Sequence, residues 1–152
     1  MPTHHKGSPR EIETLNAFIK LSRASNTLHN YLSRKLAECD ITESQFGVLE
    51  ALYHLGPLNQ KALGDKILKS GGNITMVVMN LEKQGWVQKD KDPTDLRSHI
   101  IKLTPAGEDF IATIFPNHIE RVVELFSELS NDELATFGDL CKKIGLKAAQ
   151  SS

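Results

Sequence analysis

The sequence predicts a mainly α-helical fold with one small β-hairpin. Apolar residues recur at three- and four-residue spacings along most of the 152 residues, which is the period of amphipathic helices. This period is interrupted once, at residues 86–103, by two short runs that are typical of strands. Hydrophobic residues make up 39% and charged residues 24% of the chain, a globular composition. We therefore expect one compact domain over residues 1–152.

The first helix is predicted to begin near residue 9 and to extend for about 28 residues. Ser8, Pro9 and Glu11 form a capping box with proline at the first helical position. No Pro or Gly interrupts the apolar positions that follow, which are Ile12, Leu15, Phe18, Ile19, Leu28, Tyr31, Leu32 and Leu36. A stripe of this length exceeds what one small core can cover, so we expect a second subunit to cover the rest.

Three shorter helices are predicted before the hairpin. Residues 42–45 (TESQ) are a second capping box, which begins a helix at about 43–55. Asn59 can cap the next helix, and the turn at residues 70–72 (SGG) separates that helix from one that ends at Gly85. The last two of these helices are therefore expected to form a helix-turn-helix pair.

The hairpin and two further helices complete the prediction. Short strands are expected at 86–89 and 98–103, joined by a protruding polar loop at 90–97 that is too long for a two-residue turn. Thr104 and Pro105 begin a helix that Pro116 should kink, and residues 130–133 (SNDE) cap a last one. A hairpin directly after a helix-turn-helix pair predicts a winged helix-turn-helix.

The charge distribution favours DNA as the partner. The formal net charge is −1, but residues 60–103 carry eight Lys and Arg against five Asp and Glu, whereas residues 104–152 carry four against eight. An α-helix can fill the major groove while a basic hairpin follows the backbone beside it. Candidate DNA-binding residues in the hairpin are Lys89, Lys91, Asp95 and Arg97. Asp95 is expected to orient the Arg97 guanidinium.

Three segments in this order resemble the MarR family of bacterial transcriptional regulators: residues 81–87 (LEKQGWV), 92–97 (DPTDLR) and 103–107 (LTPAG). Residues 52–57 (LYHLGP) and 114–118 (IFPNH) are similar to the quinone- and catechol-responsive repressors of the MhqR type within that family. The resemblance implies an obligate homodimer that binds a pseudopalindromic operator on double-stranded DNA and is released by a small ligand or an oxidant. It assigns residues of about 42–104 to the DNA-binding lobe and about 9–38 and 105–147 to dimerisation.

The resemblance also places the DNA contacts. Arg97 matches the wing-tip arginine of the family and Asp95 its acidic partner. The recognition helix departs from the family pattern, because Met76 stands where a basic residue is common and Gly71 and Gly72 replace small polar or basic residues. Base contacts are therefore expected from the polar residues of this helix, with a further DNA contact from the turn before it: Ser70, Asn73, Thr75 and Asn80. Asn73 and Thr75 could instead only cap the helix or face solvent.

An effector cavity is expected between the first, second and fifth helices, where members of the family often bind phenolic compounds. Its candidate residues are His29, Tyr31, Phe46, Tyr53, His54 and Phe126, although aromatic residues at helical spacing more often simply pack. The resemblance favours a small aromatic effector. Two alternatives stay open: a redox-sensing repressor that uses Cys39, and a winged-helix module for protein–protein contacts. Cys141 is expected in the core or the dimer interface.

We expect no catalytic, metal or cofactor site. The sequence places no nucleophile–base pair, phosphate-binding glycine loop or paired-carboxylate motif. The six histidines fall on separate elements or in the first residues, and the hairpin carboxylates lack the pattern of a calcium loop. The absence of a signal segment and of a long apolar run favours a cytoplasmic location with both cysteines reduced.

Overall fold

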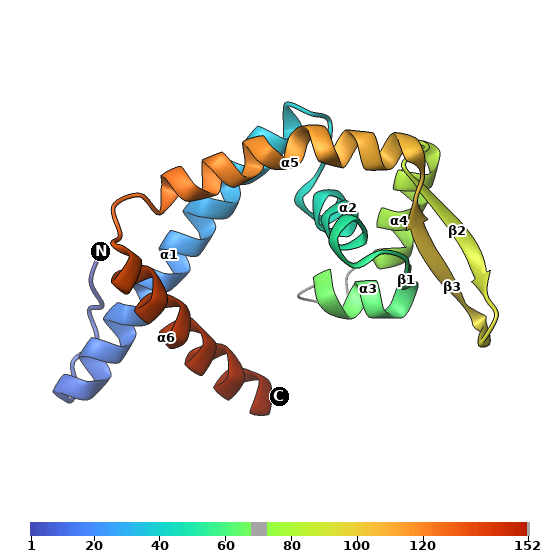
Figure 1. Cartoon of the computed structure of the whole chain (residues 1–152). Coiled ribbons are helices and arrows are strands. Elements are labelled where there is room, and N and C mark those ends of the chain that lie inside the picture. Colours follow the sequence, from blue (N-terminus) through green and yellow to red (C-terminus); the bar gives the residue numbers. More distant parts are fainter. Residues whose placement is uncertain (68–72, 152) are drawn as a thin grey trace. The chain divides into compact units, whose positions relative to one another are not determined.

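A computed structural model describes residues 1–67 and 73–151. The helices are α1 (Pro9–Ala37), α2 (Glu43–Leu55), α3 (Gln60–Ile67), α4 (Ile74–Lys83), α5 (Pro105–Leu125) and α6 (Asn131–Gln150), and the strands are β1 (Leu58–Asn59), β2 (Val87–Asp92) and β3 (Asp95–Leu103) (Figure 1). The predicted fold class, mainly helical with a small sheet, is confirmed. The chain divides into two compact units, Met1–Phe115 and Pro116–Ser152, and each is described by itself.

The helix boundaries follow the predicted caps closely. Ser8, Thr42 and Ser130 each accept a hydrogen bond from the backbone amide three residues on, at 3.2, 3.1 and 3.1 Å. In each case the side chain at that third position returns the bond to the amide of the cap, which completes the capping box. The backbone amide of Ser8 lowers the pKa of the Glu11 carboxyl in this way. Local chemistry therefore sets where these helices begin.

The hydrophobic core lies in the first unit and joins helices to the sheet. Its largest fully buried side chains come from α2, α3, α4, β3 and α5, and they are Val48, Leu49, Leu63, Val78, Leu81, Ile101 and Ile111. Since each of these elements contributes its apolar face to one cluster, α3, α4 and the sheet are held in fixed positions around it.

The sheet is larger than predicted. Within the described residues it has three antiparallel strands in the order β1-β3-β2, because Leu58 and Asn59 add a short strand that pairs with Ile101 and Ile100 (Figure 1). The predicted loop at 90–97 is wrong: β2 runs to Asp92 and β3 starts at Asp95, so only two residues form the turn. We name the hairpin of residues 87–103 the wing.

The two ends of the wing are fixed to α4 and α5. Gly85, with φ 77°, ends α4, and the amide of Trp86 returns to the Leu81 carbonyl at 3.1 Å. This is the hydrogen-bond pattern that favours glycine at a helix end. Thr104 caps α5 through the Gly107 amide at 3.0 Å and donates its hydroxyl to the Gly85 carbonyl at 2.6 Å. The two ends of the wing are therefore held next to each other, at Gly85 and Thr104.

Gly107 lets α5 lie directly against this point. A Cβ atom at this position would stand 1.9 Å from the carbonyl oxygen of Trp86, so no larger residue fits. One turn further along α5, Phe110 stacks on the Trp86 ring with the centroids 3.9 Å apart. The segment that carries the family resemblance at residues 103–107 thus serves close packing of α5 behind the wing.

The second unit contains the end of α5 and all of α6. Pro116 lies inside α5, and the division between the units falls directly before it. None of the residues of α6 is buried, although Phe137 contacts Phe126 with ring centroids 6.2 Å apart. Within the described part of the chain no helix combines the length and hydropathy that a membrane crossing requires.

Candidate nucleic-acid interface

The recognition helix α4 begins at Ile74, and Asn73 caps it. The Asn73 Oδ1 atom accepts a hydrogen bond from the Met76 amide at 3.2 Å. Capping therefore uses one lone pair of the side-chain oxygen, and the Nδ2 group is left to contact a base. Ser70, which the sequence proposed as a DNA contact in the preceding turn, lies outside the described residues.

Thr75 follows on the exposed surface of α4, and it is tied to α3. Its Oγ1 atom accepts a hydrogen bond from Gln60 Nε2 at 3.2 Å, while Gln60 Oε1 is buried and has no hydrogen-bond partner among residues 1–67 and 73–151. Asn80 is half-buried. The sequence analysis missed Gln60. Its place in the first turn of α3, next to the cap Asn59, is the signal that could have found it.

The wing carries cations in two different states. Lys91 and Arg97 are exposed and Lys89 is half-buried. Lys102 forms an ion pair with Asp90 at 3.3 Å. The pKa of the Asp90 carboxyl is lowered, first by a hydrogen bond from the Gln88 side chain and then by Lys102. One lysine of the wing is thus neutralised within the strand pair, whereas the cations nearer the turn are left available for phosphate.

Asp95 does not hold the Arg97 guanidinium as predicted. Its Oδ1 atom instead accepts a hydrogen bond from the Arg97 backbone amide at 3.0 Å. An Asp side chain readily bonds the amide two residues on, because this closes a small turn without ordering a long side chain. Asp95 therefore shapes the strand start, and the Arg97 side chain lies on the exposed surface.

Asp92 organises the turn of the wing. Although it is charged, only 6% of its surface is exposed. Its Oδ1 atom accepts bonds from the Thr94 amide at 2.9 Å and hydroxyl at 2.7 Å, and Oδ2 accepts one from Asn59 Nδ2 at 3.2 Å. These bonds, with that of the Thr94 hydroxyl the largest, lower the pKa of Asp92. They also explain why residues 93–94 turn tightly in a segment without strand-like alternation of apolar residues.

Asn59 joins this turn to the helix-turn-helix. Its Nδ2 group donates to Asp92 and to the Ser98 hydroxyl, while its Oδ1 atom accepts from the Lys61 amide at 2.8 Å. One side chain therefore caps α3 and holds the wing. The sequence predicted the cap but not the bonds to the wing, because those partners lie more than 30 residues further along the chain.

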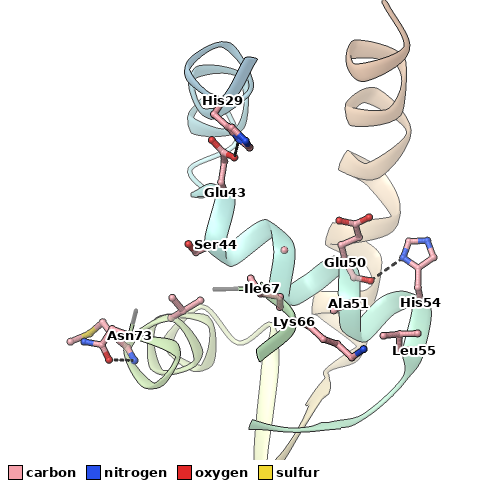
Figure 2. Close-up of a pocket in the computed structure, with 13 residues that line it drawn as sticks. His29, Glu43, Ser44, Glu50, Ala51, His54, Leu55, Lys66, Ile67 and Asn73 are labelled. Atoms are coloured by element: carbon pink, nitrogen blue, oxygen red, sulfur yellow. Dashed lines mark hydrogen bonds and ion pairs between the residues drawn. The ribbon is translucent and has the colours of Figure 1, made fainter. Parts of the chain in front are cut away.

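A cavity of about 930 Å³ opens beside the recognition helix, between α1, α2, α3 and α4 (Figure 2). His29 of α1 stands at one edge, where its Nδ1 atom donates to the Glu43 carboxylate at 2.8 Å; Ser33 donates to the same carboxylate. His54 Nδ1 donates to the Glu50 carbonyl at 2.9 Å. The apolar lining residues are Ala51, Leu55, Ile67, Met76 and Val77.

Two of the six predicted effector residues, His29 and His54, line this cavity, and four do not. Phe46 is buried with its ring 6.3 Å from that of Phe115. Tyr53 is exposed and contacts the edge of His54, and Tyr31 lies under the Lys35 amine at 6.0 Å. Phe126 belongs to the second unit. The sequence missed Glu43, Glu50 and Lys66, since a charged residue on a helix surface gives no sign of facing a cavity.

The cysteines and histidines are the sequence's candidates for redox or metal chemistry. Cys39 and Cys141 are free thiols, each half-buried, and Cys39 packs against the core. Over residues 1–67 and 73–151, no group of three or more His, Cys, Asp and Glu side chains is arranged to hold a metal ion.

The arrangement of α3, α4 and the wing defines a winged helix-turn-helix protein. An exposed helix end stands beside a basic antiparallel hairpin, and both are fixed to one core. This geometry places a helix in a major groove and a hairpin along the adjacent backbone.

Comparison with known proteins agrees with this class. The model of the MarR family matches residues 41–99. Over 138 residues the chain is 34% identical to the HTH-type transcriptional regulator MhqR of Bacillus subtilis (strain 168), and the alignment covers 91% of this chain and 95% of that protein. The chain belongs to the MarR family, and it is a transcriptional regulator that binds DNA.

Solved structures of the family share the fold. A MarR family regulator of Streptomyces coelicolor in complex with DNA has a TM-score of 0.82 at 20% identity, covering 93% of this chain and 90% of that chain. The MepR–DNA complex of S. aureus has a TM-score of 0.76 at 23% identity, covering 85% of this chain and 96% of that one.

Proposed function

We propose that the protein is a homodimeric repressor that leaves a pseudopalindromic operator when a small aromatic compound, phenolic or quinone-like, binds it. The observation that carries this proposal is the cavity of about 930 Å³, because Asn73, Met76 and Val77 of the recognition helix and its cap line it. A molecule in this cavity touches the helix that reads DNA. The similarity to MhqR supports the same class of regulator.

The lining suits an aromatic ring with polar substituents. Ala51, Leu55, Ile67 and Val77 offer apolar contact, and Glu50 and Lys66 stand among them as hydrogen-bonding groups. Pockets of this composition bind ring systems by burial and orient them with a few polar contacts. Met76 adds a flexible, polarisable side chain that can adapt to a planar ligand.

Release follows from the position of the ligand. A compound that binds more tightly to one arrangement of α4 lowers DNA affinity by the ratio of its affinities for the two arrangements. Met76 and Val77 are in the first two turns of α4, next to Asn73 and Thr75. A shift at these residues therefore moves the proposed base-reading side chains directly.

The proposed DNA contacts divide into two kinds. In the first kind, α4 contacts bases through Asn73, Thr75 and Asn80, and Ser70 in the segment before α4 adds a DNA contact. In the second kind, the wing contacts the phosphate backbone through Lys89, Lys91 and Arg97, and Asp95 shapes the strand that carries Arg97. The first kind determines which sequence is bound and the second supplies affinity for any duplex.

The proposed dimer uses the open face of α6. Large apolar side chains of this helix are exposed, namely Leu134, Phe137, Leu140, Ile144 and Leu146. Exposed stripes of this kind mark protein interfaces. A second copy of the chain is the occupant we propose, because the MarR family resemblance assigns the last helices and the first helix to self-association.

The effector proposal is tested by gel shift with DNA from upstream of the protein's own gene, titrated with methylhydroquinone, catechol and salicylate. We expect at least one aromatic to release the wild type and the Cys39→Ser/Cys141→Ser variant alike under reducing conditions. Release that occurs only in the wild type under oxidising conditions would replace this proposal with a redox sensor at Cys39.

A filled cavity provides the matched control. Ala51 lines the cavity, whereas its neighbour on α2, Tyr53, does not. Ala51→Phe should retain DNA binding and lose release by the aromatic, while Tyr53→Phe should respond as the wild type does. Equal release of both variants would show that the effector binds elsewhere.

A further inference from the structure

A second cavity lies between the wing and the helix-turn-helix. It has a volume of about 310 Å³ and is lined by Gln60, Lys61, Ile74, Arg97, Ser98 and His99. We propose that it seats one backbone phosphate of bound DNA, held by Lys61, Arg97 and His99. This inference rests on the DNA contacts of the proposed function, to which Arg97 already belongs, and adds Lys61 and His99 to them.

The alternation of β3 brings two of these side chains to the same face. Side chains of a strand point to opposite faces in turn, so Arg97, His99 and Ile101 share one face. Ile101 is fully buried in the core beneath the helices. His99 and Arg97 therefore continue this face outward from the core, over the start of α3 and α4, where Lys61 and Ile74 complete the lining.

Basic side chains line the cavity, and no described carboxylate lies among them. Among its described lining residues there is no Asp or Glu, and Lys61, Arg97 and His99 take part in none of the ion pairs of the described chain. Lys102 on the other face of β3 is, by contrast, paired with Asp90. Gathering unpaired cations around one hollow is unfavourable unless an anion joins them, so the site fits an anionic ligand.

The surroundings of His99 strengthen this charge pattern. Across the strand pair it faces Lys91 of β2, on its own strand Arg97 lies two residues before it, and α3 supplies Lys61. From α4 the cavity receives only the apolar Ile74. The nearby acid of β2, Asp92, is bound to Thr94 and Asn59. Asp95, which the same alternation places on this face two residues before Arg97, accepts a hydrogen bond from the Arg97 backbone amide and does not line the cavity. The charged side chains that line the cavity beside His99, Lys61 and Arg97, are therefore positive.

The ligand is held by side chains rather than by the end of α3. The amides of Lys61 and Ala62 are bonded to Asn59 Oδ1 at 2.8 and 3.4 Å, so these amides are already satisfied. A phosphate is the anion that fits, because lysine and arginine side chains are its usual protein ligands. DNA is its source in this proposal, since the cavity lies between the two elements that meet a duplex in a winged helix-turn-helix.

The test measures binding of a random-sequence duplex by fluorescence anisotropy between about 50 and about 200 mM KCl. The variants are Lys61→Met and His99→Gln, with Lys102→Met as the matched control on the other face of β3. Lys61→Met should lower the salt slope by about 0.9 per protomer, as the loss of one phosphate contact requires. Lys102→Met should leave the slope unchanged, and thermal unfolding should show that all variants are folded.

The histidine provides an independent readout. A histidine gains charge as the pH falls from about 8 to about 6, so His99→Gln should bind about threefold to tenfold more weakly than the wild type at the lower pH and nearly equally at the higher one. If His99→Gln bound DNA more weakly than the wild type by the same factor at both pH values, His99 would have a structural role and would not be a phosphate ligand.

Competition with inorganic phosphate at matched ionic strength tells whether the cavity binds a phosphate of DNA or a free anion. If phosphate weakens DNA binding more than KCl does in the wild type but not in Lys61→Met, one site takes both ligands and the proposal stands. If Lys61→Met loses phosphate binding while its DNA affinity and salt slope match the Lys102→Met control, the cavity is a site for free anions and the proposal is wrong. A wild type that binds no duplex would overturn DNA binding itself, which separates the two failures.

Discussion

Helices α2 and α6 both begin with a capping box, yet α2 buries its apolar side chains within the chain and α6 leaves its apolar side chains exposed. Four of the 13 residues of α2 are buried, whereas none of the 20 residues of α6 is. The apolar side chains of α2 meet the core that carries the recognition helix and the wing. Those of α6 remain on the surface of the second unit.

This difference shows how one chain divides its apolar surface. Helix α2 buries Phe46, Val48, Leu49 and Leu52 in the core of its own unit, so the packing that holds it comes from the same chain. In α6 an apolar stripe is left exposed, and an exposed stripe of this kind marks an interaction surface. The lobe is therefore expected to depend on its own packing, and α6 on a partner.

The largest effect is expected when charged residues are introduced on the exposed apolar face of α6. Phe137→Glu combined with Leu140→Glu places two carboxylates in the proposed dimer interface. We expect the sedimentation mass to fall from about twice 16.9 kDa towards one chain and operator affinity to fall about 100-fold or more, because the two half-sites lose their linkage. The control is Lys142→Glu with Lys143→Glu beside the stripe, and a wild type that sediments as a folded monomer would refute the dimer.

The packing of the DNA-binding lobe is tested at Gly107, where α5 lies against Trp86. Gly107→Ala places a methyl group on the Trp86 carbonyl oxygen, so we expect a loss of about 1–3 kcal/mol or more in the free energy of unfolding. The exposed neighbour provides the comparison, since Glu108→Gln should change stability by less than about 0.5 kcal/mol. Urea unfolding of both variants measures the difference, and equal stabilities would mean that α5 does not pack as closely on Trp86.

Within the lobe, the recognition helix and the wing should differ in what they control. Arg97→Ala should weaken binding to operator and random DNA alike, because a phosphate contact carries no sequence information. Thr75→Ala should reduce the preference for the operator by about 1–3 kcal/mol. Affinities for the two DNAs, measured over a salt series, separate these effects; identical behaviour of the two variants would remove the distinction between reading and positioning.

The smallest expected effect concerns pH and the turn of the wing. The pKa of Asp92 is lowered in the folded protein, so its ionised form stabilises the fold above the ordinary carboxyl pKa, and this contribution is lost as the pH falls through the lowered value. Asp92→Asn should therefore be less stable than the wild type near neutral pH and approach it under acid conditions. Exposed Asp109→Asn should follow the wild type throughout, and a pH-independent loss in Asp92→Asn would point to a packing effect instead.

The sequence by itself determined where the helices begin and end, as α2 illustrates. Thr42 and Gln45 cap it at one end and Gly56 ends it at the other, and both signals act within a few residues. The same holds for the end of α4 at Gly85 and the start of α5 at Thr104. The helix-turn-helix followed by a hairpin was predictable for this reason, and with it the family.

Only the tertiary structure decided how these elements serve a site. The extension of β2 and β3 depends on Asp92 and its contact with Asn59, and the tie between Thr75 and Gln60 joins two helices across a turn. Both cavities are lined by residues from several elements. Caps and breakers act through neighbouring amides and are legible in a short window of sequence, whereas these contacts join residues between 15 and 33 positions apart and exist only once the core has brought their elements together.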